Sequence, residues 1–86
     1  MDHYFFHLQA ADLWPDDEGT ELEDIEAAKR HAVQYMVEHL YHHPNRFWEA
    51  ETFEVRVADK SGLTLLVISL VATLSPPIPR GAAAAR

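Results

Sequence analysis

The histidines are the residues of this sequence whose chemistry and spacing most suggest a site. His39 and His43 lie four positions apart in a segment expected to be helical, and imidazoles at that spacing can share a metal ion. His3 and His7 point to one side of an expected strand, so strand and helix could contribute to one site. A histidine near the end of a helix also complements the helix dipole, which gives a structural explanation. We favour that explanation and keep His39 and His43 as the best candidate metal pair.

The remaining candidate catalytic groups lie in settings that do not suit catalysis. Ser61 falls in a turn, Ser69 in a strand and Ser75 at the start of a tail, and none has the strand–turn–helix setting of a hydrolase nucleophile. The adjacent acids at 16–18 lack the spacing of a calcium loop, and the three glycines do not form a phosphate-binding loop. Cysteine is absent, which excludes disulfides and thiolate metal sites. We therefore expect a protein that is not an enzyme and that uses no cofactor.

The chain is acidic, with a formal net charge of −7 from 14 acidic and 7 basic side chains. Between Asp12 and Glu26 there are eight acids and no base. Such a charge repels nucleic-acid phosphates and anionic lipids, so we expect no nucleic-acid or membrane partner. The acidic run is explained most simply as a solvated surface, and the alternative is a patch for a basic partner protein. The residues proposed for that patch are Asp16, Asp17, Glu18 and Glu21.

Neither a secretory signal nor a membrane segment is visible in the sequence. The N-terminus lacks a basic segment followed by an apolar stretch. The longest apolar run, Leu63–Leu74, has 12 residues and contains serine and threonine. A membrane-spanning helix needs about 20 apolar residues. We therefore expect a cytoplasmic protein.

The expected elements are strands flanking one long helix. Residues 4–8 form an aromatic strand, 13–14 a short edge strand limited by Pro15, and 16–19 a loop with Gly19 at positive φ. Asp24 caps a helix that ends before Pro44. Its apolar stripe consists of Ile25, Ala28, Ala32, Met36 and Leu40, widened by Val33 and Val37.

The second half of the sequence predicts a hairpin. Residues 52–58 alternate as a half-buried strand, 59–62 form a turn with Gly62 in the left-handed region, and 63–74 form a long strand. We expect one α+β domain over residues 1–74, in which one long helix packs on one face of a small antiparallel sheet in the order β-(β)-α-β-β. Residues 75–86 are expected to be a disordered tail rich in proline and alanine.

The last strand conflicts with a monomeric two-layer fold, because it is apolar on both faces. Pairing Ala58 with Leu63 would place Leu66, Ile68 and Leu70 under the helix. The apolar residues on the opposite face would need a cover, and we expect a second copy of the chain to supply it, a dimer being favoured. The segment Phe47-Trp48 or the tail could instead fold over them, and a one-residue bulge could exchange the faces. The predicted oligomer interface consists of Leu63, Leu65, Val67 and Val71.

Several motifs occur together in this sequence, namely the aromatic run Tyr4–Leu8, the acidic segment Asp17–Leu22, Asp24 with the helical start Glu26–Ala28, and the turn residues Asp59 and Gly62. Together they resemble a family of small bacterial proteins described as a domain of unknown function. The likeness covers about residues 3–70 and implies this fold without an established activity, cofactor or catalytic residue. This chain departs from the family's pattern in the Phe47-Trp48 insert, the apolar last strand and the tail.

Three functions are consistent with these features. The leading hypothesis is a non-enzymatic protein that acts through homo-oligomerisation and protein–protein contact. The layout is also similar to acidic antitoxins, which would neutralise a basic partner. It is similar as well to small flavin-storage assemblies, which suggests a ligand-binding protein with Trp48 near its site, or a metal-binding protein that uses the histidines.

Overall fold

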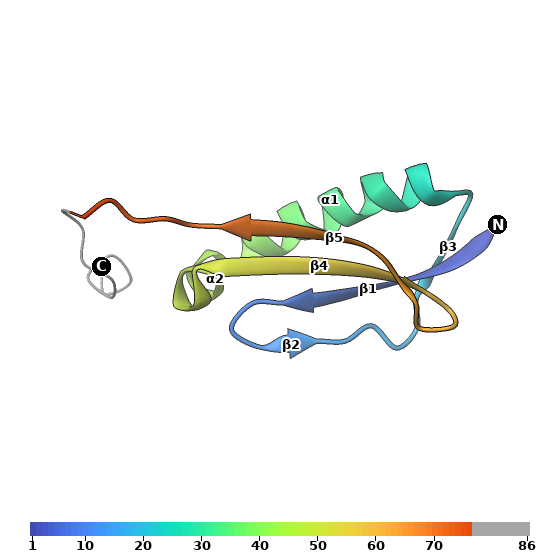
Figure 1. The fold of residues 1–86 in the computed structure, drawn as a ribbon, viewed down its shortest axis with the longest axis horizontal. Coiled ribbons are helices and arrows are strands. Elements are labelled where there is room, and N and C mark those ends of the chain that lie inside the picture. Colours follow the sequence, from blue (N-terminus) through green and yellow to red (C-terminus); the bar gives the residue numbers. More distant parts are fainter. Residues whose placement is uncertain (77–86) are drawn as a thin grey trace.

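The computed structural model describes residues 1–76, which fold as an α+β unit with a five-stranded antiparallel sheet and two helices (Figure 1). The strands lie in the order β2-β1-β4-β5, and β3 also pairs with β1. The predicted fold class is therefore confirmed. The elements are β1 (Asp2–Gln9), β2 (Leu13–Trp14), β3 (Thr20–Leu22), α1 (Ile25–His42), α2 (Pro44–Ala50), β4 (Thr52–Asp59) and β5 (Thr64–Val71).

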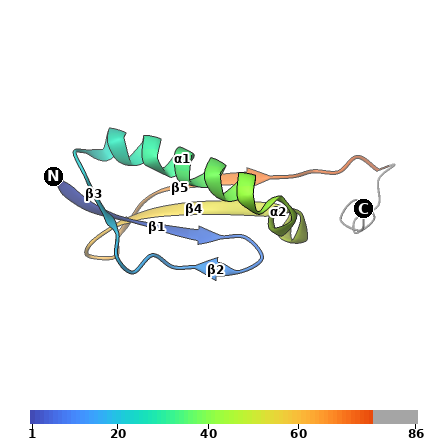
Figure 2. The ribbon, with the colours of Figure 1, turned by 180° about the vertical axis from the view of Figure 1, so that it is seen from behind.

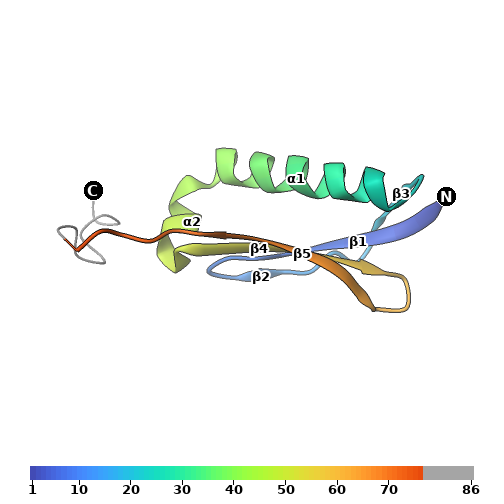
Figure 3. The same cartoon turned by 45° about the horizontal axis from the view of Figure 1, so that its top comes forward.

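The core lies between α1 and one face of the sheet (Figures 2 and 3). Strand residues alternate across a sheet, so every second side chain of β1 and β4 points toward the helix. Alanines on the facing side of α1 let the helix backbone approach the aromatic rings of the sheet. The main buried residues are Tyr4, Phe6 and Leu8 from β1, Phe53, Val55 and Val57 from β4, and Ala28, Ala32 and Met36 from α1.

The helix α1 begins and ends at the expected residues. The Asp24 carboxylate accepts a hydrogen bond of 2.9 Å from the Ala27 amide, which caps the first turn. The His43 amide donates to the His39 carbonyl at 2.9 Å, and Pro44 follows. Pro44 also begins α2, because its fixed φ and missing N–H suit the first position of a new helix. The sequence analysis did not predict α2, since seven residues are too few to show a helical period.

The strand β3 was also missed, because its three residues follow the expected loop at 16–19 within an acidic segment and are too few to show the alternation of a strand. It pairs with the start of β1, where His3 lies opposite Glu21 and Tyr4 opposite Thr20. The short β2 pairs with the end of β1 and lies at the sheet edge, as Pro15 predicted.

The hairpin turn forms around the Asp59 carboxylate. Its Oδ1 accepts hydrogen bonds from the amides of Ser61 at 2.9 Å and Leu63 at 3.0 Å. The Gly62 amide donates to the Asp59 carbonyl at 3.0 Å, and Gly62 has a φ of +91°, as predicted. The Ser61 hydroxyl, at 2.6 Å, contributes most to a lowered pKa of Asp59.

The pairing of β4 with β5 contains an irregularity that shifts the expected register. Ala58 lies opposite Thr64, but Val57 lies opposite Leu66, so Leu65 is the extra residue of a bulge. The predicted pairing of Ala58 with Leu63 is therefore wrong. The faces of Leu66, Ile68 and Leu70 are nevertheless those predicted, because the shift beyond the bulge amounts to two residues. The strand also ends at Val71, three residues earlier than expected.

The expected tail lies almost wholly outside the described residues, since only Ser75 and Pro76 of it are described. Across residues 1–76, neither helix has the length and apolar composition needed to cross a membrane.

Gly19 should be intolerant of a side chain, in contrast to Gly62. Gly19 has a φ of +73°, and a Cβ there would lie 2.6 Å from His3 Nε2 and 2.9 Å from the Phe5 ring. Gly62 has a φ of +91° with no atom within 4 Å of such a Cβ. Gly62→Ala should therefore cost about 1 kcal/mol from the backbone alone, and Gly19→Ala should cost about 2–3 kcal/mol. Urea unfolding of both variants measures the difference, and equal losses would contradict the crowding argument.

Candidate self-association surface

The strand β5 and the preceding residue Leu63 carry the candidate surface, because their apolar side chains remain exposed in the single chain. The exposed fractions are 62% for Leu63, 39% for Leu65, 47% for Val67 and 63% for Val71. These are the four residues that the sequence analysis proposed as an oligomer interface. Their role in association remains a prediction, to which the structure adds their position at one edge of the sheet.

The exposed apolar surface on the face away from α1 is one strand wide. Val67 and Ser69 of β5 lie opposite Arg56 and Glu54 of β4, and Val71 continues the row. Arg56 and Glu54 are exposed charged residues, so the apolar surface does not extend from β5 across β4. A broad apolar sheet face is therefore absent from this part of the chain, and the apolar side chains follow the edge.

The helix-covered side of β5 is also only partly buried. Leu70 is 40% exposed, and Val33 and Val37 of α1 are 50% and 59% exposed. The prediction that these valines widen the buried helix stripe is therefore wrong. The reason is that α1 lies over β1 and β4, with the His31 ring packed at a tilt against Phe6 of β1 at a centroid distance of 4.6 Å. The flank of α1 that carries Val33 is turned away from β1, toward the β5 side of the sheet.

The segment Phe47-Trp48 does not cover the exposed residues of β5. Phe47 is buried in the core cluster on the α1 side of the sheet. Trp48 packs edge-on against Phe47 with ring centroids 5.2 Å apart and is 40% exposed. Figure 3 shows α2 at the end of the sheet where β4 begins. The sequence analysis proposed the Phe47-Trp48 segment and the tail as alternative covers for these residues. The first does not cover them, and the tail beyond Pro76 lies outside the described residues.

Asp16, proposed for a partner patch, instead closes the opposite edge of the sheet. Its carboxylate accepts hydrogen bonds from the amides of Phe6 (3.1 Å), Glu18 (3.1 Å) and Gly19 (2.9 Å). The Asp16 amide in turn donates to His7 Nδ1 at 3.1 Å. Phe6 lies between the β1 residues that pair with β3 and those that pair with β2, so Asp16 fills the gap in the ladder. The loop is therefore a structural part of the sheet edge.

The pKa of Asp16 reflects this position. Partial burial raises the pKa, but the hydrogen bonds from the Gly19, Phe6 and Glu18 amides outweigh it, with help from His7, and the net pKa is lowered. The Asp16 carboxylate is therefore charged near neutral pH and accepts hydrogen bonds from these amides.

The other three proposed patch residues, Asp17, Glu18 and Glu21, are exposed. His3 holds this segment against β1: its Nε2 lies 2.7 Å from the Glu18 carbonyl oxygen and its Nδ1 lies 4.0 Å from the Glu21 carboxylate. An acidic rim therefore lies along the β2–β3 edge, and its binding of a basic partner remains a prediction.

The candidate metal pair lies in an aromatic cluster at the end of α1. The rings of His39 and His43 are adjacent, with centroids 4.9 Å apart. His39 also packs edge-on against Trp14 and Phe53, each with ring centroids 5.1 Å away. Its Nε2 is buried without a hydrogen-bond partner. Among residues 1–76 no three histidine or acidic side chains are grouped to hold a metal ion, and this geometry resembles packing more than coordination.

Burial lowers the pKa of His39, and the neighbouring His43 lowers it further. His39 is therefore held as neutral imidazole near neutral pH, which suits its contacts with two aromatic rings. The expected grouping of His3 and His7 with this cluster does not occur, because His3 contacts Glu18 and His7 contacts Asp16 at the far edge of β1.

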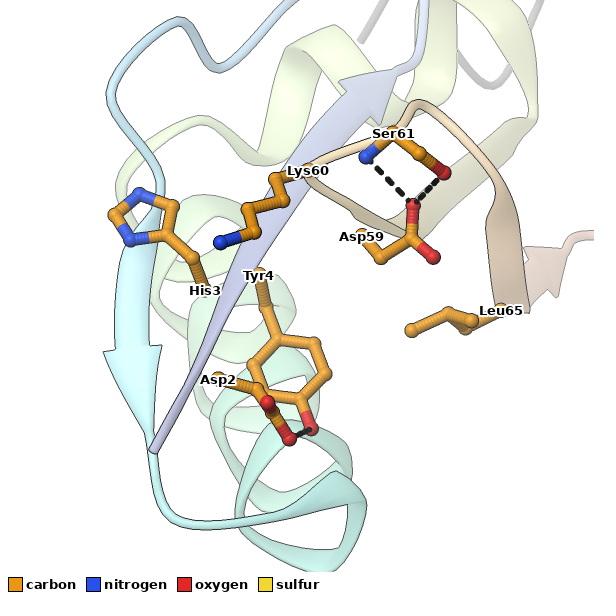
Figure 4. A pocket seen from close by; sticks show the side chains of 7 residues that line it. All are labelled: Asp2, His3, Tyr4, Asp59, Lys60, Ser61 and Leu65. Carbon is orange, nitrogen blue, oxygen red and sulfur yellow. Dashed lines mark hydrogen bonds between the residues drawn. The ribbon is translucent and has the colours of Figure 1, made fainter.

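An open hollow of about 460 Å³ lies between the start of β1 and the β4–β5 turn (Figure 4). Both carboxylates that line the hollow already accept hydrogen bonds. Asp59 accepts them from the β4–β5 turn, and Asp2 accepts one of 3.5 Å from the Tyr4 hydroxyl. Burial and the Asp2 charge raise the pKa of Tyr4. The lining of the hollow is Asp2, His3, Tyr4, Asp59, Lys60, Ser61 and Leu65.

A comparison with family models matches residues 3–72 to a domain of unknown function (DUF6894). No curated protein and no solved structure gave a match. The matched region includes all the strands except the first residue of β1, and both helices. The expected membership in a family described as a domain of unknown function is therefore confirmed, and the match brings no residue with an assigned role.

Replacing Asp16 with asparagine should weaken the hydrogen bonds that close the β1 edge of the sheet. An amide nitrogen in place of Oδ2 would face the Phe6 N–H as a second donor, so Asp16→Asn should cost about 1.5–3 kcal/mol at pH 7. Because the folded pKa is lowered, this contribution is present above the unfolded pKa of about 3.9 and is lost as pH falls through the folded pKa. Urea unfolding at pH 7 and pH 3 should show the difference shrinking. Asp17→Asn is the exposed control and should be near neutral.

His39 should make the fold less stable in weak acid. Since its folded pKa is lowered, the unfolded chain takes up the proton first, and stability falls as pH drops below the unfolded value of about 6.5. His39→Phe keeps an aromatic ring without this titration. Thermal unfolding between pH 7.5 and 5.5 should therefore show a smaller loss for His39→Phe than for the unmodified chain. His42→Phe, at an exposed position of the same turn, serves as the control, and equal losses in all three proteins would refute the assignment.

Proposed function

The chain belongs to the family described as a domain of unknown function, and we propose that this member is a non-enzymatic protein that acts as a homo-oligomer through β5. The observation that carries the proposal is the exposure of Val67 and Val71, at 47% and 63%, on an uncharged strand. Charged residues occupy the solvent-facing positions of β4. Apolar side chains at solvent-facing positions are therefore a feature of β5 and not of the sheet as a whole.

The energy available from covering β5 is large for a chain of this size. Burying one apolar side chain completely stabilises by about 1.5–3 kcal/mol, and half-exposed side chains give roughly half of that. Four such residues together amount to several kcal/mol, which is comparable with the 5–15 kcal/mol of total stability typical of a domain. Self-association is thus an effective way for this chain to gain burial, since it has no cysteine for a disulfide.

A non-enzymatic role agrees with the state of the polar groups. Asp16 and Asp59 bind backbone amides, and Ser61 donates to Asp59 within the turn. These groups stabilise loops and are not free to transfer protons or attack a substrate. We further propose a cytoplasmic location, which the absence of cysteine and the acidic surface favour.

Val67→Asp tests the proposal with little risk to the fold. The new carboxylate would lie opposite Arg56, so the β4–β5 pair gains a cross-strand ion pair while the apolar edge gains a charge. Size-exclusion chromatography with light scattering should show an oligomer for the unmodified chain at micromolar concentration and a monomer for Val67→Asp.

Leu13→Asp is the matched control, because Leu13 is a 56% exposed apolar residue at the opposite edge. It should leave the oligomer intact. A monomeric unmodified chain, or an oligomer unaffected by Val67→Asp, would overturn the proposal.

A further inference from the structure

We infer that a second copy of this chain pairs with the outer edge of β5 in antiparallel register, so that one continuous sheet runs through both subunits. This inference rests on the proposed self-association and specifies its geometry. Within residues 1–76, β5 pairs only with β4 and its other edge has no partner strand. An uncovered edge of that kind presents a row of backbone donors and acceptors to another strand.

The two edges of the sheet differ in how they are protected. The β1 edge is closed by β3, by the Asp16 carboxylate and by β2, and it carries Pro15 and the exposed acids of the β2–β3 loop. Proline and charge are the usual means by which an edge strand resists pairing. The segment Thr64–Val71 has neither, and at eight residues it is long for an edge strand. The chain thus protects one edge and leaves the other competent to pair.

The distribution of apolar side chains favours edge pairing over stacking of sheet faces. Val67 and Val71 are exposed on one face of β5, and Leu70 is 40% exposed on the other. Packing of one sheet face on another would cover only one of these rows. A strand added beside β5 contacts both rows at once, since cross-strand neighbours lie about 5 Å apart on each face. One occupant therefore accounts for the exposed residues on both faces.

The backbone of β5 is oriented for this pairing. The Ala72 amide donates to the Glu51 carbonyl at 3.0 Å, so the Ala72 backbone points toward β4. Backbone direction alternates along a strand, and therefore Val67, Ser69 and Val71 direct their N–H and C=O groups away from β4. These are the groups that a second β5 would bind.

Charge indicates that the occupant is another copy rather than a charged segment. No charged residue occurs from Leu63 to Leu74, so an antiparallel pair of β5 strands brings no like charges together. The acids from Asp12 to Glu21 lie in β3 and in the segments beside β2 and β3, and so on the opposite edge of the sheet, at the far ends of the joined sheet. A dimer formed through β5 thus keeps the acidic edges of the two subunits apart.

Ser69→Pro tests the pairing, because proline removes the outward N–H of Ser69 while leaving the amides that point toward β4. Ser69→Ala keeps that N–H and is the matched control. Light scattering at micromolar concentration should give a dimer for the unmodified chain and for Ser69→Ala. Ser69→Pro should be monomeric, with its dissociation constant raised at least tenfold. A cooperative thermal transition in circular dichroism establishes that Ser69→Pro is folded.

Hydrogen exchange of the unmodified chain gives a second reading that does not depend on a folded variant. The amides of Val67, Ser69 and Val71 should become protected as protein concentration rises. The amides of Ile68 and Leu70 point toward β4 and should be protected at every concentration, which provides an internal control.

The outcomes separate the two proposals. A dimer that Val67→Asp disrupts but folded Ser69→Pro does not would refute edge pairing and retain self-association. A monomer with unprotected outward amides would refute both. Protection of those amides at all concentrations in a monomer would also refute both, since it would identify the remainder of the chain as the occupant.

Discussion

The width of a single helix is the constraint on which the rest of this structure depends. A helix with its side chains is about 10–12 Å across, and strands lie about 4.8 Å apart, so one helix covers two to three strands. Here α1 contributes its alanines and Met36 to the core over β1 and β4. The outermost strand β5 lies at the margin of that cover. Leu66 and Ile68 still pack against the core, whereas Leu70 is 40% exposed although it faces the same side as the buried Phe53.

The same limitation applies to the other edge, where the chain uses a polar solution. The β2 and β3 strands have two and three residues and could not protect β1 by themselves. The Asp16 carboxylate supplies the missing acceptor for Phe6, and Gly19 lets the loop approach His3 and Phe5 closely. β2, the loop that carries Asp16, and β3 thus cover the edge of β1 as a single strand would. An acidic loop that seemed from composition to be only a solvated surface contains a residue on which the sheet edge depends.

The sequence was informative where long periodic patterns and strong local signals coincide. Alternation in 52–58, the stripe of α1, Asp24 as a cap and Gly62 in the turn all led to correct elements, because each reflects a local preference. Two kinds of feature could not be predicted. The elements α2 and β3 are too short to show a period, and the role of Asp16 depends on its distance from Phe6 in the folded chain. The exposure of Val33 and Val37 depends on where the helix lies over the sheet, which periodicity does not specify.

The difference between the two edges also determines what kind of assembly the sheet can form. A strand edge that pairs with itself about a two-fold axis is used completely by one partner, because residues 1–76 of each copy leave only the β5 edge open. After such pairing, the edges that remain are the β2–β3 sides. There the Asp16 carboxylate already accepts the hydrogen bond of the Phe6 N–H, and Pro15 and the neighbouring acids disfavour pairing with a further strand. Growth of such a joined sheet would therefore stop at two copies. An apolar, uncharged strand of eight residues would ordinarily be an aggregation hazard. In this fold the closed edge makes that strand compatible with a finite assembly, since a fibre would need both edges to be open.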